Sequence, residues 1–224
     1  QLFPVIARDN GSRTIMVSAH PVILSATRLS KSFDDVVHLR GHPYSGVFDV
    51  VSQADLALDR LDERPFFLYV HLLDTHFPHR LEPPYDQWLD RRARSPQMLL
   101  DQPRFYENAD FTQGDKEYLR GLHDGSILQS DAGIARLIAA LKARRLFENT
   151  VFIIGGDHGE VLGEDGATVG HGSNSFDEVM RVPLIVSGPG VPVGERYSPS
   201  VANLDIVPTL VGLLGFETSA EFHG

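Results

Sequence analysis

The segment VFIIGGDHGE (residues 151–160) contains a run of apolar residues and then a polar tetrapeptide, DHGE, whose side chains can take part in a functional site. The apolar residues 151–154 predict a short, fully buried strand of a parallel α/β sheet. Two glycines end that strand, and Asp157 and His158 follow directly. Ligands of open α/β sheets bind beyond the carboxyl ends of the strands, so this position favours a functional site. A carboxylate and an imidazole there, with a further imidazole at His171, suit a divalent metal and an anionic substrate.

A purely structural role accounts for the same tetrapeptide. Asp157 is a favourable N-cap, and Glu160 three residues later completes the pattern of a capping box. His171 stands between two glycines, where a turn residue is also expected. The tetrapeptide alone does not distinguish a metal site from the start of a helix. Glu160 in particular is expected to begin a helix.

Composition excludes several kinds of site. The 224 residues include 30 acidic and 20 basic ones, which gives a net charge of −10 with neutral histidines. No stripe of Lys and Arg is available to neutralise phosphates, so we expect no nucleic-acid partner. The chain has no cysteine, which removes disulfides, thiolate metal ligands and a cysteine nucleophile. No apolar run approaches the roughly 18 residues that a membrane span needs.

Segments typical of strands alternate along the chain with segments typical of helices. Strands are expected at residues 13–18, 66–72, 151–154 and 181–186, and helices at residues 45–63, 116–145 and 203–214. This alternation predicts βαβ units, and therefore an α/β fold with a mostly parallel sheet sandwiched by helices. The buried stripe expected on the 116–145 helix is Ile127, Ile134, Leu137, Ile138 and Leu141.

Residues 80–115 depart from this alternation, because they contain four prolines and few periodic apolar side chains. Long segments of this kind inside a domain are often binding loops or covers. We therefore expect a lid or insertion at residues 80–115, within a single domain that spans residues 1–224.

Five segments carry a more specific signal. They are NGSRTIMVSAHPVI (10–23), PFFLYVHLLDTHFPH (65–79), HDGSILQSDAGIARLIAALKARRLFENTVFIIGGDHGE (123–160), RVPLIVSGPGV (181–191) and NLDIVPTLVGLLG (203–215). In this order they resemble the sulfatase branch of the alkaline phosphatase superfamily. The resemblance covers most of the chain and implies a sulfatase-like α/β domain. It also implies metal-assisted attack on a sulfate or phosphate ester.

The resemblance implies roles for individual residues. Asp157 and His158 would be metal ligands. His76 would hydrogen-bond a substrate oxygen, and a loop histidine that packs on Phe77 is the alternative. His171 would lie near the leaving group, as its proton donor or as a fixed cation. The metal would be Ca²⁺, Mn²⁺, Zn²⁺ or Mg²⁺, and the imidazole ligand slightly favours Mn²⁺ or Zn²⁺.

The nucleophile segment of the family has no counterpart in this sequence. Sulfatases place a Cys or Ser in a C/S-x-P-x-R setting, after a strand that supplies Asp metal ligands, and neither feature is found here. We therefore expect the chain to be the carboxyl-terminal portion of a longer enzyme, incomplete at its N-terminus, with two or more metal ligands supplied by the missing part. By itself it is expected to be inactive and to leave a sheet edge exposed.

The function expected for the parent protein is hydrolysis of a sulfate or phosphate ester, including phosphodiesters and phosphonates, or transfer of a phospho-headgroup. Its partner would be a small anionic ester substrate. The alternative is a non-catalytic sulfatase-like domain retained for binding or regulation. A nucleotide-binding domain is disfavoured, because no GxGxxG or GxxxxGK loop is present. By analogy with the family, we expect the periplasm or the extracellular face of the inner membrane, with any membrane anchor outside this chain.

Overall fold

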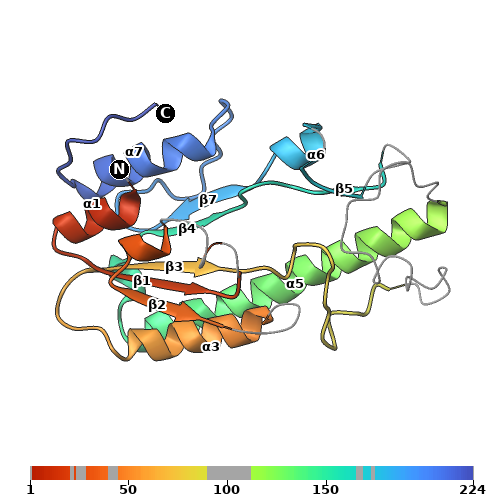
Figure 1. The fold of residues 1–224 in the computed structure, drawn as a ribbon, viewed down its shortest axis with the longest axis horizontal. Helices are drawn as coiled ribbons and strands as arrows, with labels where there is room; N and C mark the ends of the chain where they lie inside the picture. Colours follow the sequence, from red (N-terminus) through yellow and green to blue (C-terminus); the bar gives the residue numbers. More distant parts are fainter. Residues whose placement is uncertain are drawn as a thin grey trace. The chain divides into compact units, whose positions relative to one another are not determined.

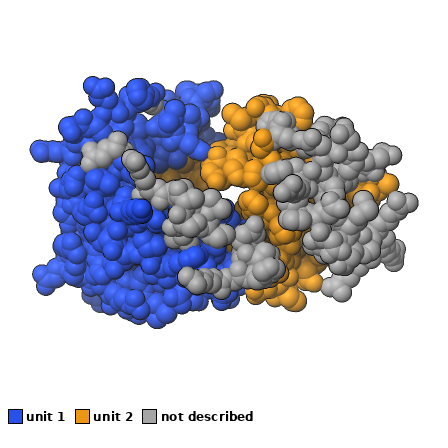
Figure 2. Space-filling view, viewed as in Figure 1, with its two compact units in different colours: residues 1–73, 136–152, 187–224 blue, residues 74–135, 153–186 orange. Residues whose placement is uncertain are grey.

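The computed structural model describes residues 2–20, 23, 29–39, 45–89, 112–164, 169–172 and 175–223. Contacts within the chain form two compact units, which are coloured separately in Figure 2. Unit 1 comprises residues 1–73, 136–152 and 187–224, and unit 2 comprises residues 74–135 and 153–186. Most of the predicted lid, residues 90–111, lies outside the described residues, so the lid stays a prediction.

Unit 1 is built on a parallel sheet of three strands. β1 (Arg13–Ser18) lies in the middle, with β2 (Asp35–His38) on one side and β3 (Phe66–His71) on the other (Figure 1). Ser18 is in register with His71, so β1 and β3 end at the same edge of the sheet. The strand predicted at residues 13–18 is confirmed without change as β1. The strand predicted at residues 66–72 is β3, which ends one residue earlier than predicted.

Helix α3 (Val47–Leu58) covers one face of this sheet (Figure 1). The helical spacing predicts its buried residues, which include Val47, Val50, Val51, Ala54 and Leu58. These side chains share a core with the even-numbered residues of β3. Phe67, on the opposite face of β3, contacts Phe3 of α1 (Phe3–Asp9) and Phe33 instead. A parallel sheet with helices on both faces confirms the predicted α/β class.

The last helix of unit 1, α7 (Ile206–Leu214), follows a 3₁₀ turn, η3 (Asn203–Asp205). The Asp205 carboxylate accepts a hydrogen bond from the Ala202 N–H at 2.6 Å, which caps this start. Gly215 ends the helix in the left-handed region, with a φ of 64°. Together, η3 and α7 span residues 203–214, which is the last segment predicted to be helical. Two further 3₁₀ turns are η1 (Ser30–Ser32) and η2 (Phe147–Asn149).

Unit 2 contains short strands in pairs. β4 (Phe152–Gly155) pairs with β7 (Leu184–Ser187), and β5 (Val161–Leu162) pairs antiparallel with β6 (Val169–Gly170). A short helix, α6 (Asp177–Met180), precedes β7. β4 is the strand predicted from the VFII run, shifted by one residue, but its side chains are half-buried rather than fully buried. Among the strands of the described residues β4 pairs only with β7, so it receives less cover than the centre of a wide sheet.

The longest helix, α5 (Gln113–Ala143), contributes its first part to unit 2 and its last residues to unit 1. In unit 1, Leu137 and Leu141 are buried, as predicted. In unit 2 the predicted stripe is wrong at Ile127, which is 47% exposed, while Gln129 is buried instead. This face of α5 binds a polar loop, so apolar periodicity does not identify it. No helix in the described part of the chain is long and apolar enough to cross a membrane.

Candidate active site

The segment after β4 bends once and continues without forming a helix. The Gly159 N–H donates to the carbonyl of Val179 at 2.7 Å, which ties the segment to α6. β5 then begins at Val161. The predicted helix start at Asp157 and Glu160 is therefore wrong, because bonding to α6 and pairing with β6 replace the bonds of a helical turn.

Three of the predicted site residues meet in one cluster within unit 2. The ring centroids of His158 and His171 are 3.8 Å apart. The ring of His76 lies 5.0 Å from that of His171 and 6.4 Å from that of His158. These histidines come from the loop after β3, the segment after β4 and the end of β6. The cluster agrees with a shared site, while the role of each residue stays a prediction.

A carboxylate oxygen of Asp157 lies near a ring nitrogen of His158. Asp157 Oδ2 lies 3.8 Å from His158 Nε2. Metal–ligand bonds of about 2.1 Å give this separation at an angle of about 130°, so both atoms can bind one cation. The other nitrogen of His158, Nδ1, lies 3.0 Å from the Gly159 carbonyl. Such a bond to a backbone carbonyl commonly orients a metal-binding histidine. The pair therefore fits a divalent cation.

Two protein ligands alone make a weak metal site. Divalent cations take about four to eight ligands in proteins. In the described ranges, no group of three or more His, Asp or Glu side chains is arranged to hold a metal. A cation at Asp157 and His158 would need further ligands, and their source stays a prediction.

Glu160 joins the cluster, although the sequence pattern favours a helix start there. Its Oε1 lies 3.1 Å from His171 Nδ1, and its Oε2 accepts a hydrogen bond from the Phe77 N–H at 3.2 Å. The Glu160 side chain is only 6% exposed, against 19% for His171. Its partner His171 is eleven residues away across a strand pair, and no local spacing rule predicts that contact.

Burial opposes charge on both members of this pair. Burial raises the pKa of the Glu160 carboxyl, while the neighbouring His76 acts in the opposite direction. Burial also lowers the pKa of His171, and the nearby His158 adds to that effect. The hydrogen bond between Glu160 and His171 therefore lies where an unpaired charge is costly and the position of each proton matters.

The loop that carries His76 is fastened to α5 by one buried glutamine. Gln129 is 1% exposed. Its Nε2 donates to Asp74 Oδ1 at 2.7 Å and to the Arg80 carbonyl at 3.1 Å. Its Oε1 accepts the Glu82 N–H at 2.8 Å. One side chain thus binds the loop on both sides of His76.

Replacing Gln129 with leucine is expected to lower the free energy of unfolding by about 3 kcal/mol, because three buried hydrogen bonds are lost without a change in size. Urea denaturation measures the change. Gln113→Leu, on the same helix but exposed and bonded only to Glu117 among the described contacts, is the control and is expected to change stability by less than about 0.5 kcal/mol. Similar losses in both variants would contradict a fastening role for Gln129.

His79 follows in the same loop and is buried, with 4% exposure. Its ring packs edge-on against His123 at 5.6 Å and Phe77 at 6.0 Å. Nδ1 lies 3.4 Å from the Asp74 carbonyl, while Nε2 has no hydrogen-bond partner in the part of the chain that the structure describes. Burial lowers the pKa of His79 to about 4, so the side chain is neutral at neutral pH. We infer a packing role for this histidine.

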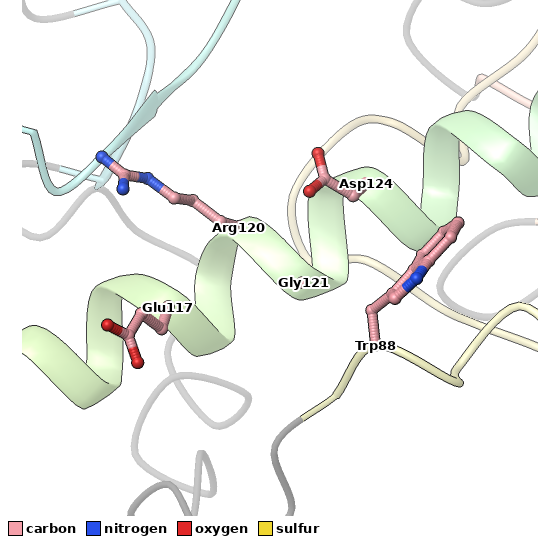
Figure 3. Close-up of a pocket in the computed structure, with 5 residues that line it drawn as sticks. All are labelled: Trp88, Glu117, Arg120, Gly121 and Asp124. Atoms are coloured by element: carbon pink, nitrogen blue, oxygen red, sulfur yellow. The ribbon is translucent and has the colours of Figure 1, made fainter.

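A separate hollow of about 410 Å³ lies along α5, lined by Trp88, Glu117, Arg120, Gly121 and Asp124. Figure 3 shows Glu117, Arg120 and Asp124 projecting from α5 in different directions, with the Trp88 ring close to the helix. Gly121 is needed at this point, because a Cβ there would lie 2.9 Å from the Trp88 carbonyl oxygen. The hollow includes no member of the histidine cluster, and its charged groups are exposed, so the cluster remains the candidate active site.

Comparison with known proteins identifies relatives over most of the chain. The family model described as sulfatase matches residues 47–216. The chain is 29% identical over 181 residues to an ulvan-active sulfatase from Formosa agariphila, which is 79% of this chain and 34% of that protein. It is 34% identical over 110 residues to a choline-sulfatase from Rhizobium meliloti, which is 49% of this chain and 21% of that protein. The chain thus spans about a third or less of the length of these curated relatives.

Solved structures share the fold. The crystal structure of a phosphonate monoester hydrolase from Agrobacterium radiobacter matches 97% of this chain and 58% of its own, with a TM-score of 0.73 at 20% identity. A protein in complex with its substrate D-glucosamine-2-N,6-O-disulfate matches 100% of this chain and 63% of its own, with a TM-score of 0.69 at 18% identity. These matches confirm the predicted fold. Because the family model also covers most of the sequence, the chain belongs to the sulfatase family of the alkaline phosphatase superfamily.

Proposed function

We propose that the protein containing this chain hydrolyses a small anionic sulfate or phosphate ester at the histidine cluster. The observation that carries the proposal is the grouping of His76, His158 and His171 beside Asp157 in a sulfatase-family chain. Both curated relatives above are named as sulfatases, which favours a sulfate ester. The chain shares its fold with a phosphonate monoester hydrolase, so phosphorus esters are the second substrate class to be tested. Transfer of a phospho-headgroup is tested together with hydrolysis of these esters.

Each residue of the cluster has one role in this proposal. A divalent cation held in part by Asp157 and His158 would supply positive charge against the oxyanion of the ester. His76 donates a hydrogen bond to a substrate oxygen. His171 gives a proton to the leaving-group oxygen, and it does so from Nε2 because its Nδ1 faces Glu160. The nucleophile and the other metal ligands come from outside this chain.

The second candidate function is binding without catalysis. No C/S-x-P-x-R segment lies in these 224 residues, so the presence or absence of a nucleophile in the full-length protein decides between the two functions. We propose in either case that the parent protein works in the periplasm or at the extracellular face of the inner membrane, as in many members of the family. Cell fractionation of the full-length protein tests that location.

Assays of the full-length protein with an aryl sulfate and an aryl phosphodiester, with and without Mn²⁺, test the enzymatic function. We expect His158→Ala and His171→Ala each to lower kcat/KM by about 100-fold or more, since one loses a metal ligand and the other a proton donor. His38→Ala, at an exposed position of β2, is the control and should keep full activity. Residues 1–224 alone are expected to show no turnover. An active full-length protein that tolerates both cluster variants would exclude the proposed site.

A further inference from the structure

Glu160 is a buried carboxylate to which the roles proposed above give no task of its own. Its side chain is 6% exposed, just before β5. One oxygen lies 3.1 Å from His171 Nδ1, and the other accepts the Phe77 N–H at 3.2 Å. Phe77 is the neighbour of His76 in the sequence. Each carboxylate oxygen therefore binds a different segment that carries a histidine of the cluster.

Packing does not require a carboxylate at this position. Leu162 of β5 and Val169 of β6 are buried in one cluster with Leu119 of α5, and Phe77 packs against this cluster. These apolar contacts already hold the two strands and the loop together. Moving a carboxylate out of water is unfavourable unless its oxygens are well bonded, so an apolar side chain would stabilise the same packing at lower cost.

We propose that Glu160 is a positioning residue that sets the proton and the orientation of His171. The inference rests on the proposed ester hydrolysis. An ionised carboxylate only accepts hydrogen bonds, so His171 keeps a proton on Nδ1 whether it is neutral or protonated. It gives a proton to the leaving group from Nε2 as the imidazolium and returns to the neutral Nδ1–H form. The second oxygen of Glu160 holds the amide next to His76. A single carboxylate thus orients both imidazoles and acts on the substrate only through them.

The Glu160→Gln variant separates positioning from a simple structural tie. An amide has one acceptor oxygen and one donor NH₂ group. With its oxygen on the Phe77 N–H, its NH₂ group faces His171 Nδ1, which must then accept. In ¹⁵N spectra of the full-length protein, at a pH where imidazoles are neutral, we expect His171 to change from the Nδ1–H to the Nε2–H tautomer. Glu164→Gln is the matched control, because Glu164 also accepts a backbone N–H, from Leu162 at 2.6 Å, and should leave the tautomer unchanged.

Two leaving groups provide a second readout. An alkyl leaving group needs a proton, whereas 4-nitrophenolate leaves without one. We expect Glu160→Gln to lower kcat about 100-fold for an alkyl ester and less than about 5-fold for a 4-nitrophenyl ester, because an amide NH₂ group facing Nδ1 cannot accept the Nδ1–H of the imidazolium that donates the proton. An unchanged tautomer, or equal losses for both esters, would overturn the proposal and leave Glu160 as a structural tie. If the wild-type protein turns over neither ester, the proposed function fails, while the tautomer measurement still decides the role of Glu160.

Discussion

Replacing Gly159 with alanine is expected to lower kcat/KM of the full-length protein by about 100-fold or more. A Cβ at this position would overlap the carbonyl oxygen of Glu178 and crowd the backbone of Val179. These are main-chain atoms of α6, so they cannot rotate away as a flexible side chain would. The Gly159 N–H also donates to the Val179 carbonyl at 2.7 Å, so the overlap pushes apart two segments that are bonded to each other. The segment that carries Asp157 and His158 has to move, and a displacement of about 1 Å at a catalytic group can cost 100-fold in rate.

Gly159→Ala should also weaken cation binding, because it displaces both proposed ligands together. Isothermal titration of the full-length protein with Mn²⁺ measures this loss, and urea denaturation measures an expected loss of about 1–3 kcal/mol from overpacking. Gly114→Ala is the matched control in the same unit, since among the described residues its Cβ would meet only Thr112 Oγ1 at 3.9 Å. Wild-type Mn²⁺ affinity and turnover in Gly159→Ala would show that the backbone at Glu178 yields and that the approach is not constrained.

The parts of the fold that follow local periodicity are predictable from the sequence. β1 is confirmed residue for residue, and α3 buries the apolar positions that its spacing indicates. Prediction fails where a distant segment sets the environment. On α5, Ile127 is exposed and Gln129 is buried, because the loop around His76 offers polar groups to that face of the helix. No apolar pattern records such a partner.

The residues of the candidate site also differ in whether the sequence predicts them. The family resemblance points to His76, His158 and His171, and the structure groups them. Glu160 has a plausible local explanation as part of a capping box, and only the contact across β5 and β6 shows its link to His171. Nothing in the sequence around His79 marks it as buried, with no hydrogen-bond partner for Nε2 among the residues that the structure describes. The contact between Glu160 and His171 and the burial of His79 both arise from tertiary packing, which spacing rules do not encode.

Acid is expected to destabilise the protein through His79. The pKa of this group is 6.5 before folding, and burial lowers it to about 4 in the folded protein. Between these values the unfolded chain binds a proton that the folded protein does not, so stability falls as the pH falls through this window. The total loss at the acid end approaches about 3 kcal/mol. The hydrogen bond to the Asp74 carbonyl favours protonation of His79, while His123 and His76 oppose it, each by less.

Replacing His79 with phenylalanine removes the titrating group and keeps an aromatic ring against Phe77. Between pH 6.5 and about 4, we expect this variant to lose about 3 kcal/mol less than the wild type, measured by urea denaturation at each pH. His38→Gln, at an exposed position of β2, is the control and should follow the wild type. Parallel curves for wild type and His79→Phe would rule out His79 as the source of acid sensitivity. The difference between the curves is the informative quantity, because Glu160 acts in the opposite sense: burial raises its pKa, so its own contribution to stability grows as the pH falls.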